Sequence, residues 1–197
     1  MTYFRRRYLS FTIAAAVLLV FAAGPRAQSN AEPEEFTAFA INMGALTTGT
    51  TANLIITVNR WSTQAEREKF LEVLRAKGPE GLIEALRGAP RLGSLRTAES
   101  IGYELRFAIQ DPGPDGGRRV LIATDRPIGF LEATNRPHTI DYPFTVIDMQ
   151  LRPDGKGQGT LALAARIVPT GKNIVVENYD TQPIRLNRIE TRKLTKR

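Results

Sequence analysis

The stretch Ile101-Gly102-Tyr103-Glu104-Leu105-Arg106-Phe107-Ala108-Ile109-Gln110 alternates large apolar side chains with polar or small ones. Successive side chains of a β-strand point to opposite faces of the sheet, so this pattern predicts a strand with one buried and one wet face. A turn rich in Asp, Pro and Gly follows at 111–117, and a second apolar run follows at 119–124. Together they predict an antiparallel hairpin.

Similar runs recur along the chain and predict about eight strands. Short turns such as 153–157 separate most of them, which favours sequential antiparallel pairing. The segment 89–100 holds Pro90 and Gly93 and is expected to be a loop. The expected strands are 36–46, 52–60, 101–110, 119–124, 142–151, 160–168, 174–179 and 184–189.

Residues 63–87 change to the spacing of helices. Thr63-Gln64-Ala65-Glu66 has the form of a capping box, in which two side chains satisfy amide groups at the start of a helix. Gly78 and Pro79 divide the segment, because glycine commonly ends a helix and proline suits the first position of the next. We therefore expect a helical hairpin, about 63–87, packed on the sheet.

The predicted fold class is α+β, predominantly antiparallel β. Eight antiparallel strands in one domain curl into a barrel or divide into a two-sheet sandwich, and the pattern does not separate these alternatives. The expected organisation is a flexible N-terminal segment at 28–35, a single β-rich domain at 36–189 and a basic C-terminal tail at 190–197.

Residues 1–27 are predicted to be a signal peptide. Three arginines, Arg5 to Arg7, precede an apolar run of 13 residues at 11–23, which is shorter than the about 20 residues of a membrane-spanning helix. We expect export to the periplasm or the medium and no transmembrane span in the mature protein. An uncleaved signal anchor is the alternative.

The net charge of +7 is confined to the two ends of the chain. Residues 1–27 hold four bases and no acid, and residues 185–197 hold six bases and one acid, which leaves 17 bases against 19 acids in residues 28–184. Residues 28–184 therefore have a net charge of −2 and lack the dense basic face that nucleic-acid binding requires. The basic C-terminal end at 185–197 is expected to be a solvated, frayed terminus, and the alternative is contact with an anionic surface of the cell envelope.

Residue types also exclude several chemistries. The chain has no Cys and one His, so disulfides, thiolate nucleophiles and a zinc site built mainly of His are excluded. No Ser lies in a Gly-x-Ser-x-Gly elbow, and no glycine-rich loop precedes a helix in the way that nucleotide binding requires. We expect no cofactor and no metal.

The irregular segment 125–142 is the first candidate for a site, because binding groups tend to lie on loops held by a rigid sheet. Two arginines there have the geometry to hold a carboxylate or phosphate, and the single His beside an Asp would make an acid–base pair. The same residue types are also typical of turns and surface ion pairs, so no catalytic residue is assigned. The candidate binding residues are Asp125, Arg126, Arg136, His138, Asp141 and Tyr142.

The segments 123–130 and 135–144 resemble those of a group of exported bacterial proteins, and the resemblance extends over most of the mature chain. It implies export. It supplies no activity, ligand or catalytic residue that can be carried over.

Three functional hypotheses follow. The first is a non-enzymatic exported domain that binds a small apolar or anionic ligand, or another envelope component, with an eight-stranded barrel as one way to enclose the ligand. The second is a hydrolase or isomerase that uses carboxylate and arginine groups of 125–142. The third is a structural module of the envelope.

The export route is open to a direct test. The run Arg5-Arg6-Arg7-Tyr8-Leu9-Ser10 partly matches the twin-arginine signal, with Tyr and Ser in place of its Phe and Lys. In an Arg5→Lys, Arg6→Lys variant, export by the general secretory route should continue, because the positive charge is kept, whereas twin-arginine export should stop. Immunoblots of cell fractions measure the difference, with Arg26→Lys as the control.

Overall fold

The computed structural model describes residues 31–41, 51–98, 100–125, 144–170, 173–178 and 183–195. The predicted signal peptide lies outside the described residues. The elements, in chain order, are β1 (Glu34–Ile41), β2 (Thr51–Val58), α1 (Gln64–Arg87), β3 (Gly93–Thr97), β4 (Tyr103–Leu105), β5 (Phe107–Pro112), the short 3-10 helix η2 (Pro114–Gly116), β6 (Arg118–Thr124), β7 (Phe144–Leu151), β8 (Gly157–Thr170), β9 (Asn173–Asn178) and β10 (Ile184–Lys193).

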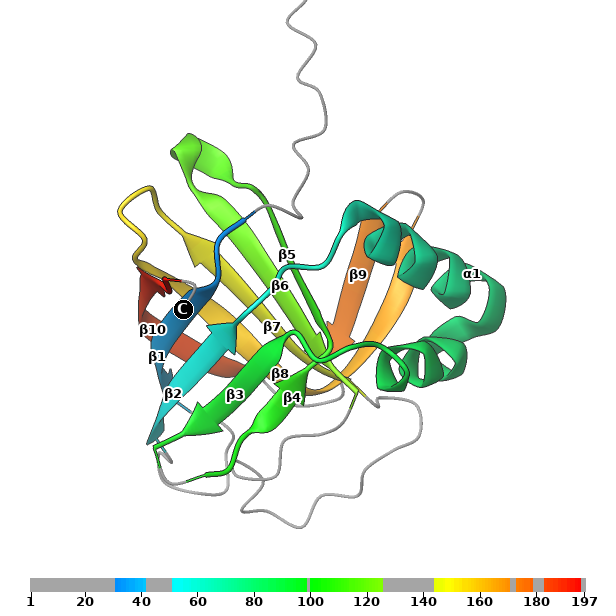
Figure 1. The fold of residues 1–197 in the computed structure, drawn as a ribbon, viewed down its shortest axis with the longest axis horizontal. Helices are drawn as coiled ribbons and strands as arrows, with labels where there is room; N and C mark the ends of the chain where they lie inside the picture. Colours follow the sequence, from blue (N-terminus) through cyan, green and yellow to red (C-terminus); the bar gives the residue numbers. More distant parts are fainter. Residues whose placement is uncertain are drawn as a thin grey trace, which may run out of the picture.

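The strands form one antiparallel sheet that curls into a nearly closed barrel (Figure 1). The strand order is β4-β3-β2-β1-β10-β8-β7-β6-β5, and β9 pairs with β8 outside this path. The two ends of the order, β4 and β5, are consecutive in the sequence and are separated only by Arg106. One bent strand therefore joins both ends of the sheet, and the barrel is observed rather than the sandwich.

The described residues form ten strands, where about eight were expected for the chain. One reason is that the predicted strand 101–110 divides at Arg106 into β4 and β5. The other is that β3 lies within the segment expected to be a loop. Gly93 permits this strand, because a Cβ there would lie 1.8 Å from the carbonyl oxygen of Thr57 on β2, so the residue that looked like a loop signal allows close strand pairing.

The alternation in 101–110 does not correspond to one buried and one wet face. Tyr103 packs against the barrel interior and Leu105 lies within it, whereas Phe107 and Ile109 belong to a second cluster outside the barrel. Ala108, between these two, points back into the interior. Both faces of β5 are therefore buried, one inside the barrel and one beneath α1, and the prediction of a wet face was wrong there.

Helix α1 packs on one side of the outside of the barrel (Figure 1). Its capping box is confirmed: the Glu66 N–H donates to Thr63 Oγ1 at 3.1 Å, and the Thr63 N–H donates to the Glu66 carboxylate at 2.8 Å. Gly78 interrupts the helix with φ 69° and ψ −168°, and Pro79 begins the second part. The expected helical hairpin is therefore roughly present, as one helix broken at a glycine.

Large apolar side chains fill the described interior of the barrel. Phe36 and Trp61 meet edge to face with their ring centroids 6.4 Å apart, and the Trp61 indole N–H donates to the Glu32 carbonyl at 3.0 Å. The other large side chains of this cluster that are almost fully buried are Leu54, Ile56, Leu92, Leu95, Leu105, Ile122 and Ile147.

Ser62 stabilises the closure of the barrel. Its N–H donates to the Ala108 carbonyl at 2.8 Å, and its Oγ accepts the Ala108 N–H at 3.1 Å. Ser62 is 1% exposed, so Ser62→Ala leaves a buried N–H without its acceptor. We expect a loss of about 1–3 kcal/mol in the free energy of unfolding, measured by urea denaturation. Ser94→Ala on half-buried β3 is the matched control, with a change within about 0.5 kcal/mol; equal losses would contradict the role of Ser62.

Candidate functional site

The structure describes one of the six residues expected to form a site, Asp125. It follows β6 and is 6% exposed, and its carboxylate lies 3.8 Å from Arg106 Nε. The same guanidinium donates to the Ala89 carbonyl at 2.8 Å and to the Glu104 carboxylate at 2.5 Å. Asp125 is thus part of the corner where β4 meets β5. The five that lie outside the described residues are Arg126, Arg136, His138, Asp141 and Tyr142.

The described residues form a cleft of about 490 Å³ at one end of the barrel. The β5–β6 and β7–β8 hairpins and the start of β1 lie at this end (Figure 1). We call this cleft the polar mouth. The charged and amide side chains that line it are Glu32, Glu34, Gln110, Arg118, Arg152, Asp154 and Lys193.

A buried ion pair forms the inner wall of the polar mouth. Arg118 donates to the two carboxylate oxygens of Glu34 at 2.8 and 3.1 Å and to the Gln110 amide oxygen at 2.6 Å. The side chain of Glu34 is 6% exposed and that of Arg118 is 25% exposed. The guanidinium carbon also lies 5.9 Å from the centre of the Phe36 ring. These contacts satisfy both charges, which is required when an ion pair leaves water.

More exposed charges form the rim. Lys193 Nζ lies 2.9 Å from the Glu32 carboxylate, and Arg152 lies 3.2 Å from Asp154. The hydrogen bond from Lys193 lowers the pKa of Glu32, and that from Glu32 raises the pKa of Lys193. The backbone N–H of Lys156, together with Arg152, lowers the pKa of Asp154.

The strand pattern explains why these polar groups meet. Glu34 is the first residue of β1, and its side chain lies on the inward face of the strand with Phe36, Ala38 and Ala40. Arg118 similarly precedes Val120 and Ile122 in the inward row of β6. In the sequence, the signal for this site was a charged residue at an alternate position next to the apolar, inward-facing residues of each strand. It was missed because β1 was predicted to begin at Phe36 and β6 at Arg119.

The described residues that line the polar mouth carry both charges and include no imidazole. Three carboxylates and three cationic groups line it, so it has no net charge. Such an arrangement can hydrogen-bond the anionic and the cationic group of one small ligand. A volume of about 490 Å³ lies in the usual range of small-molecule sites, about 300–1,000 Å³, and the mouth of a barrel is a common place for them. One lining hydroxyl, Thr191 Oγ1, is buried without a hydrogen-bond partner among the described residues.

A second cavity lies between α1 and the outside of the barrel. Its volume is about 30 Å³, and apart from Arg67 its lining is apolar, with Phe70, Leu74, Phe107 and Ile167 among the side chains. This is far below the about 300–1,000 Å³ of small-molecule sites. The cavity is too small for an organic ligand, and its walls are the packing contacts of the helix.

The described ranges contain no group of three or more His, Asp or Glu side chains placed to hold a metal ion. In the same ranges, no helix has the length and apolar character needed to cross a membrane. Comparison of the chain with protein-family models, with curated proteins and with solved structures finds no match.

The rim ion pair gives a prediction for titration. Because Lys193 lowers the pKa of Glu32, the pair is complete above the ordinary pKa of a glutamate and is lost as the pH falls through the lowered pKa. In Lys193→Gln we expect the pKa of Glu32 to rise towards its ordinary value, measured by carboxyl carbon NMR. Lys69→Gln on α1 is the control and should leave the Glu32 titration unchanged. An identical Glu32 titration in both variants would contradict the pairing.

Proposed function

We propose that this protein is an exported, non-enzymatic binding domain that holds a small polar ligand in the polar mouth. The observation that carries the proposal is the buried Glu34–Arg118–Gln110 network at the inner wall of a cleft of about 490 Å³. Export is inferred from the basic and apolar segment at 1–23.

The filled interior supports a ligand at the mouth rather than inside the barrel. Just below the mouth, Phe36, Trp61 and Ile189 are each at most 1% exposed and pack in one cluster. An apolar ligand would need a cavity lined by such side chains, and the described interior is occupied by them. The ligand therefore reaches the inner wall of the mouth and meets mainly polar groups there.

The charges of the mouth favour a ligand that carries both a cationic and an anionic group. Arg152 and Lys193 present cations to an anion, while Asp154 and Glu32 present carboxylates to a cation. A ligand with one charge would be attracted by half of the rim and repelled by the other half. Free amino acids and short peptides have the required pair of opposite charges.

The rival enzyme hypothesis draws on other residues. A hydrolase or isomerase that uses 125–142 needs Asp125, Asp141 and His138 within hydrogen-bond reach of one another, and two of these lie outside the described residues. In the mouth itself, Glu34 accepts two hydrogen bonds from Arg118. Both oxygens of this carboxylate therefore already have a hydrogen-bond partner. A structural module of the envelope, the third hypothesis, would bind no small ligand.

Titration with a dipeptide tests the proposal. Alanyl-alanine added to the ¹⁵N-labelled protein should give saturable amide shifts that cluster at Gln110, Gly117 and Thr191. Acetate and methylamine, with one charge each, should bind more weakly, and laurate should not bind. Removal of a rim charge in Asp154→Asn or Lys193→Gln should weaken dipeptide binding, because each substitution removes one of the charges that would pair with the ligand.

The control is Arg119→Gln, whose guanidinium pairs with Asp148 at 2.6 Å on the outside of the barrel, and its affinity should not change. Shifts that appear only with laurate, or shifts that the rim variants leave unaltered, would contradict binding in the polar mouth. Release of free alanine during the titration would favour the hydrolase.

A further inference from the structure

The outer face of β10, β1, β2 and β3 carries more positive than negative charge. Its described charged residues are Arg96, Arg185, Arg188, Arg192, Glu35 and Glu190. Glu35 pairs with Arg192 at 2.7 Å, and Glu190 lies 3.9 Å from Lys156 of the β7–β8 turn. Arg96, Arg185 and Arg188 form no ion pair with a described residue. We call this surface the basic wall.

Half-buried apolar side chains lie between these arginines. Ile41 is the register partner of Arg185 and Ile55 that of Arg96, while Phe39 lies two residues before Ile41 on the same face of β1. Cationic groups around apolar side chains are typical of surfaces that lie at the interface between water and lipid. An acidic polysaccharide would pair with the arginines but would offer no apolar layer.

The backbone of β10 turns Arg188 outward at a conformational cost. Between the pairs Phe39↔Asn187 and Thr37↔Glu190, the single residue Ala38 faces two residues of β10, so the strand has a bulge there. Arg188 takes φ 50° in the bulge, a left-handed conformation that suits Gly or Asn better than Arg. The bulge returns Ile189 to the interior and leaves an exposed arginine on the wall.

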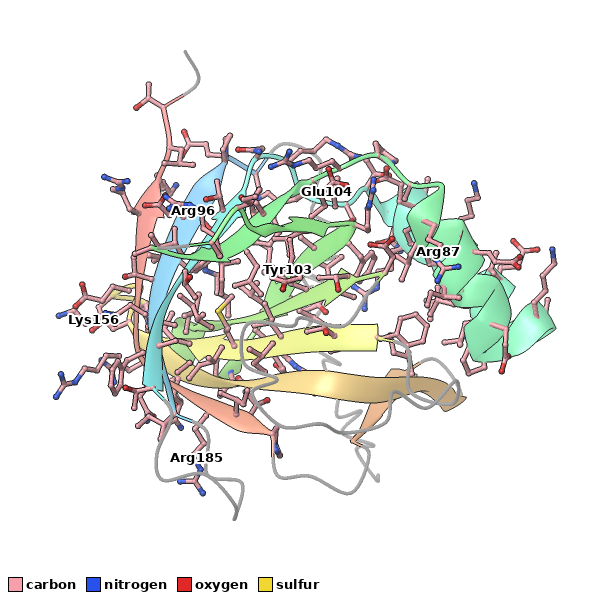
Figure 2. All side chains as sticks on the ribbon, turned by 90° about the horizontal axis from the view of Figure 1, so that it is seen from below. Arg87, Arg96, Tyr103, Glu104, Lys156 and Arg185 are labelled. Atoms are coloured by element: carbon pink, nitrogen blue, oxygen red, sulfur yellow. The ribbon has the colours of Figure 1, made fainter. Side chains whose placement is uncertain are left out.

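Figure 2 shows the placement of the basic wall relative to the helix. Arg96, Lys156 and Arg185 lie on one side of the barrel, and Arg87 of α1 lies on the opposite side. The polar mouth opens at the end of the barrel. A partner that contacts the wall therefore leaves the mouth accessible.

From the arginines that form no ion pair with a described residue, the apolar side chains between them and the outward bulge, we infer that the basic wall docks on the surface of an anionic lipid bilayer. The structure assigns this contact to the strand wall itself, with Arg96 on β3 as part of it, whereas the sequence had suggested the basic C-terminal segment 185–197 as a tail. Residues 190–193 of that segment lie in β10, and two of them, Arg192 and Lys193, are engaged in ion pairs with acids near β1.

Vesicle binding tests the inference with a charge-matched control. The full chain is sedimented with vesicles of phosphatidylcholine that contain phosphatidylglycerol, and with phosphatidylcholine alone. The triple variant Arg96→Gln, Arg185→Gln, Arg188→Gln should lose at least about tenfold in affinity for the anionic vesicles, and the loss should shrink in high salt. The control Lys69→Gln, Lys77→Gln, Arg87→Gln removes the same charge from α1 and should bind like the parent chain.

Arg188→Asn separates docking from folding. Asn tolerates the left-handed conformation, so this variant should melt at the same or a higher temperature than the parent and yet bind anionic vesicles more weakly. A variant that melts lower and binds equally well would assign Arg188 a structural role and overturn the inference.

A local probe excludes binding through other parts of the chain. The sequence has no Cys, so Thr37→Cys on the basic wall can carry a single polarity-sensitive dye, with Glu72→Cys on α1 as the control. Anionic vesicles should shift the emission of the dye at position 37 to shorter wavelength and leave that at position 72 unchanged. An unshifted dye at 37 on bound vesicles, equal losses in both triple variants, or a larger shift with alginate than with vesicles would each overturn lipid docking.

Discussion

The closure of the barrel at Arg106 is the constraint on which the rest of the structure depends. The chain enters this corner paired with β3 and leaves it paired with β6, so one strand supplies both edges of the sheet. The Arg106 N–H donates to the Ala123 carbonyl at 3.2 Å. Its guanidinium donates to Ala89 and Glu104 before the corner and lies 3.8 Å from the Asp125 carboxylate after it. Ser62 pairs with the free edge of β5. An open sheet would expose the apolar row that these contacts enclose.

Closure also explains the positions of the other features. Inward-facing residues in the middle of the barrel must be apolar because they are removed from water, whereas those at the open end can be polar and pair with each other. Glu34 and Arg118 lie at that boundary, and neither would be tolerated there alone. Phe107 and Ile109 face outward after the corner and need a cover, which α1 provides. The basic wall is the side that α1 leaves uncovered, so charge accumulates there without disturbing either core.

Much of the fold was predictable from local patterns, and the candidate site was not. The alternation of apolar and polar side chains predicted the β-rich class, and the capping box of Thr63 and Glu66 predicted the start of the helix. Both features depend only on residues that are close in the sequence. The strand β3 was missed because Gly93 signals a loop unless a neighbouring backbone approaches it closely. The polar mouth was missed because Glu34 and Arg118 are 84 residues apart, and a single sequence does not reveal which distant charges meet.

The sequence by itself determined the spacing of apolar residues, the helix cap, the break at Gly78 and the concentration of positive charge at the two ends. These features act over one strand or one helical turn, so they can be read without knowing the partners. Only the tertiary structure decided that the sheet closes, that the apolar row of 101–110 divides between two cores, and that Arg118 neutralises Glu34. It also decided that Arg185 and Arg188 lie on a wall of the barrel. The physical reason is that the burial and ion pairing of a side chain depend on which segments pack together in space. The closure of the barrel at Arg106 determines which segments these are.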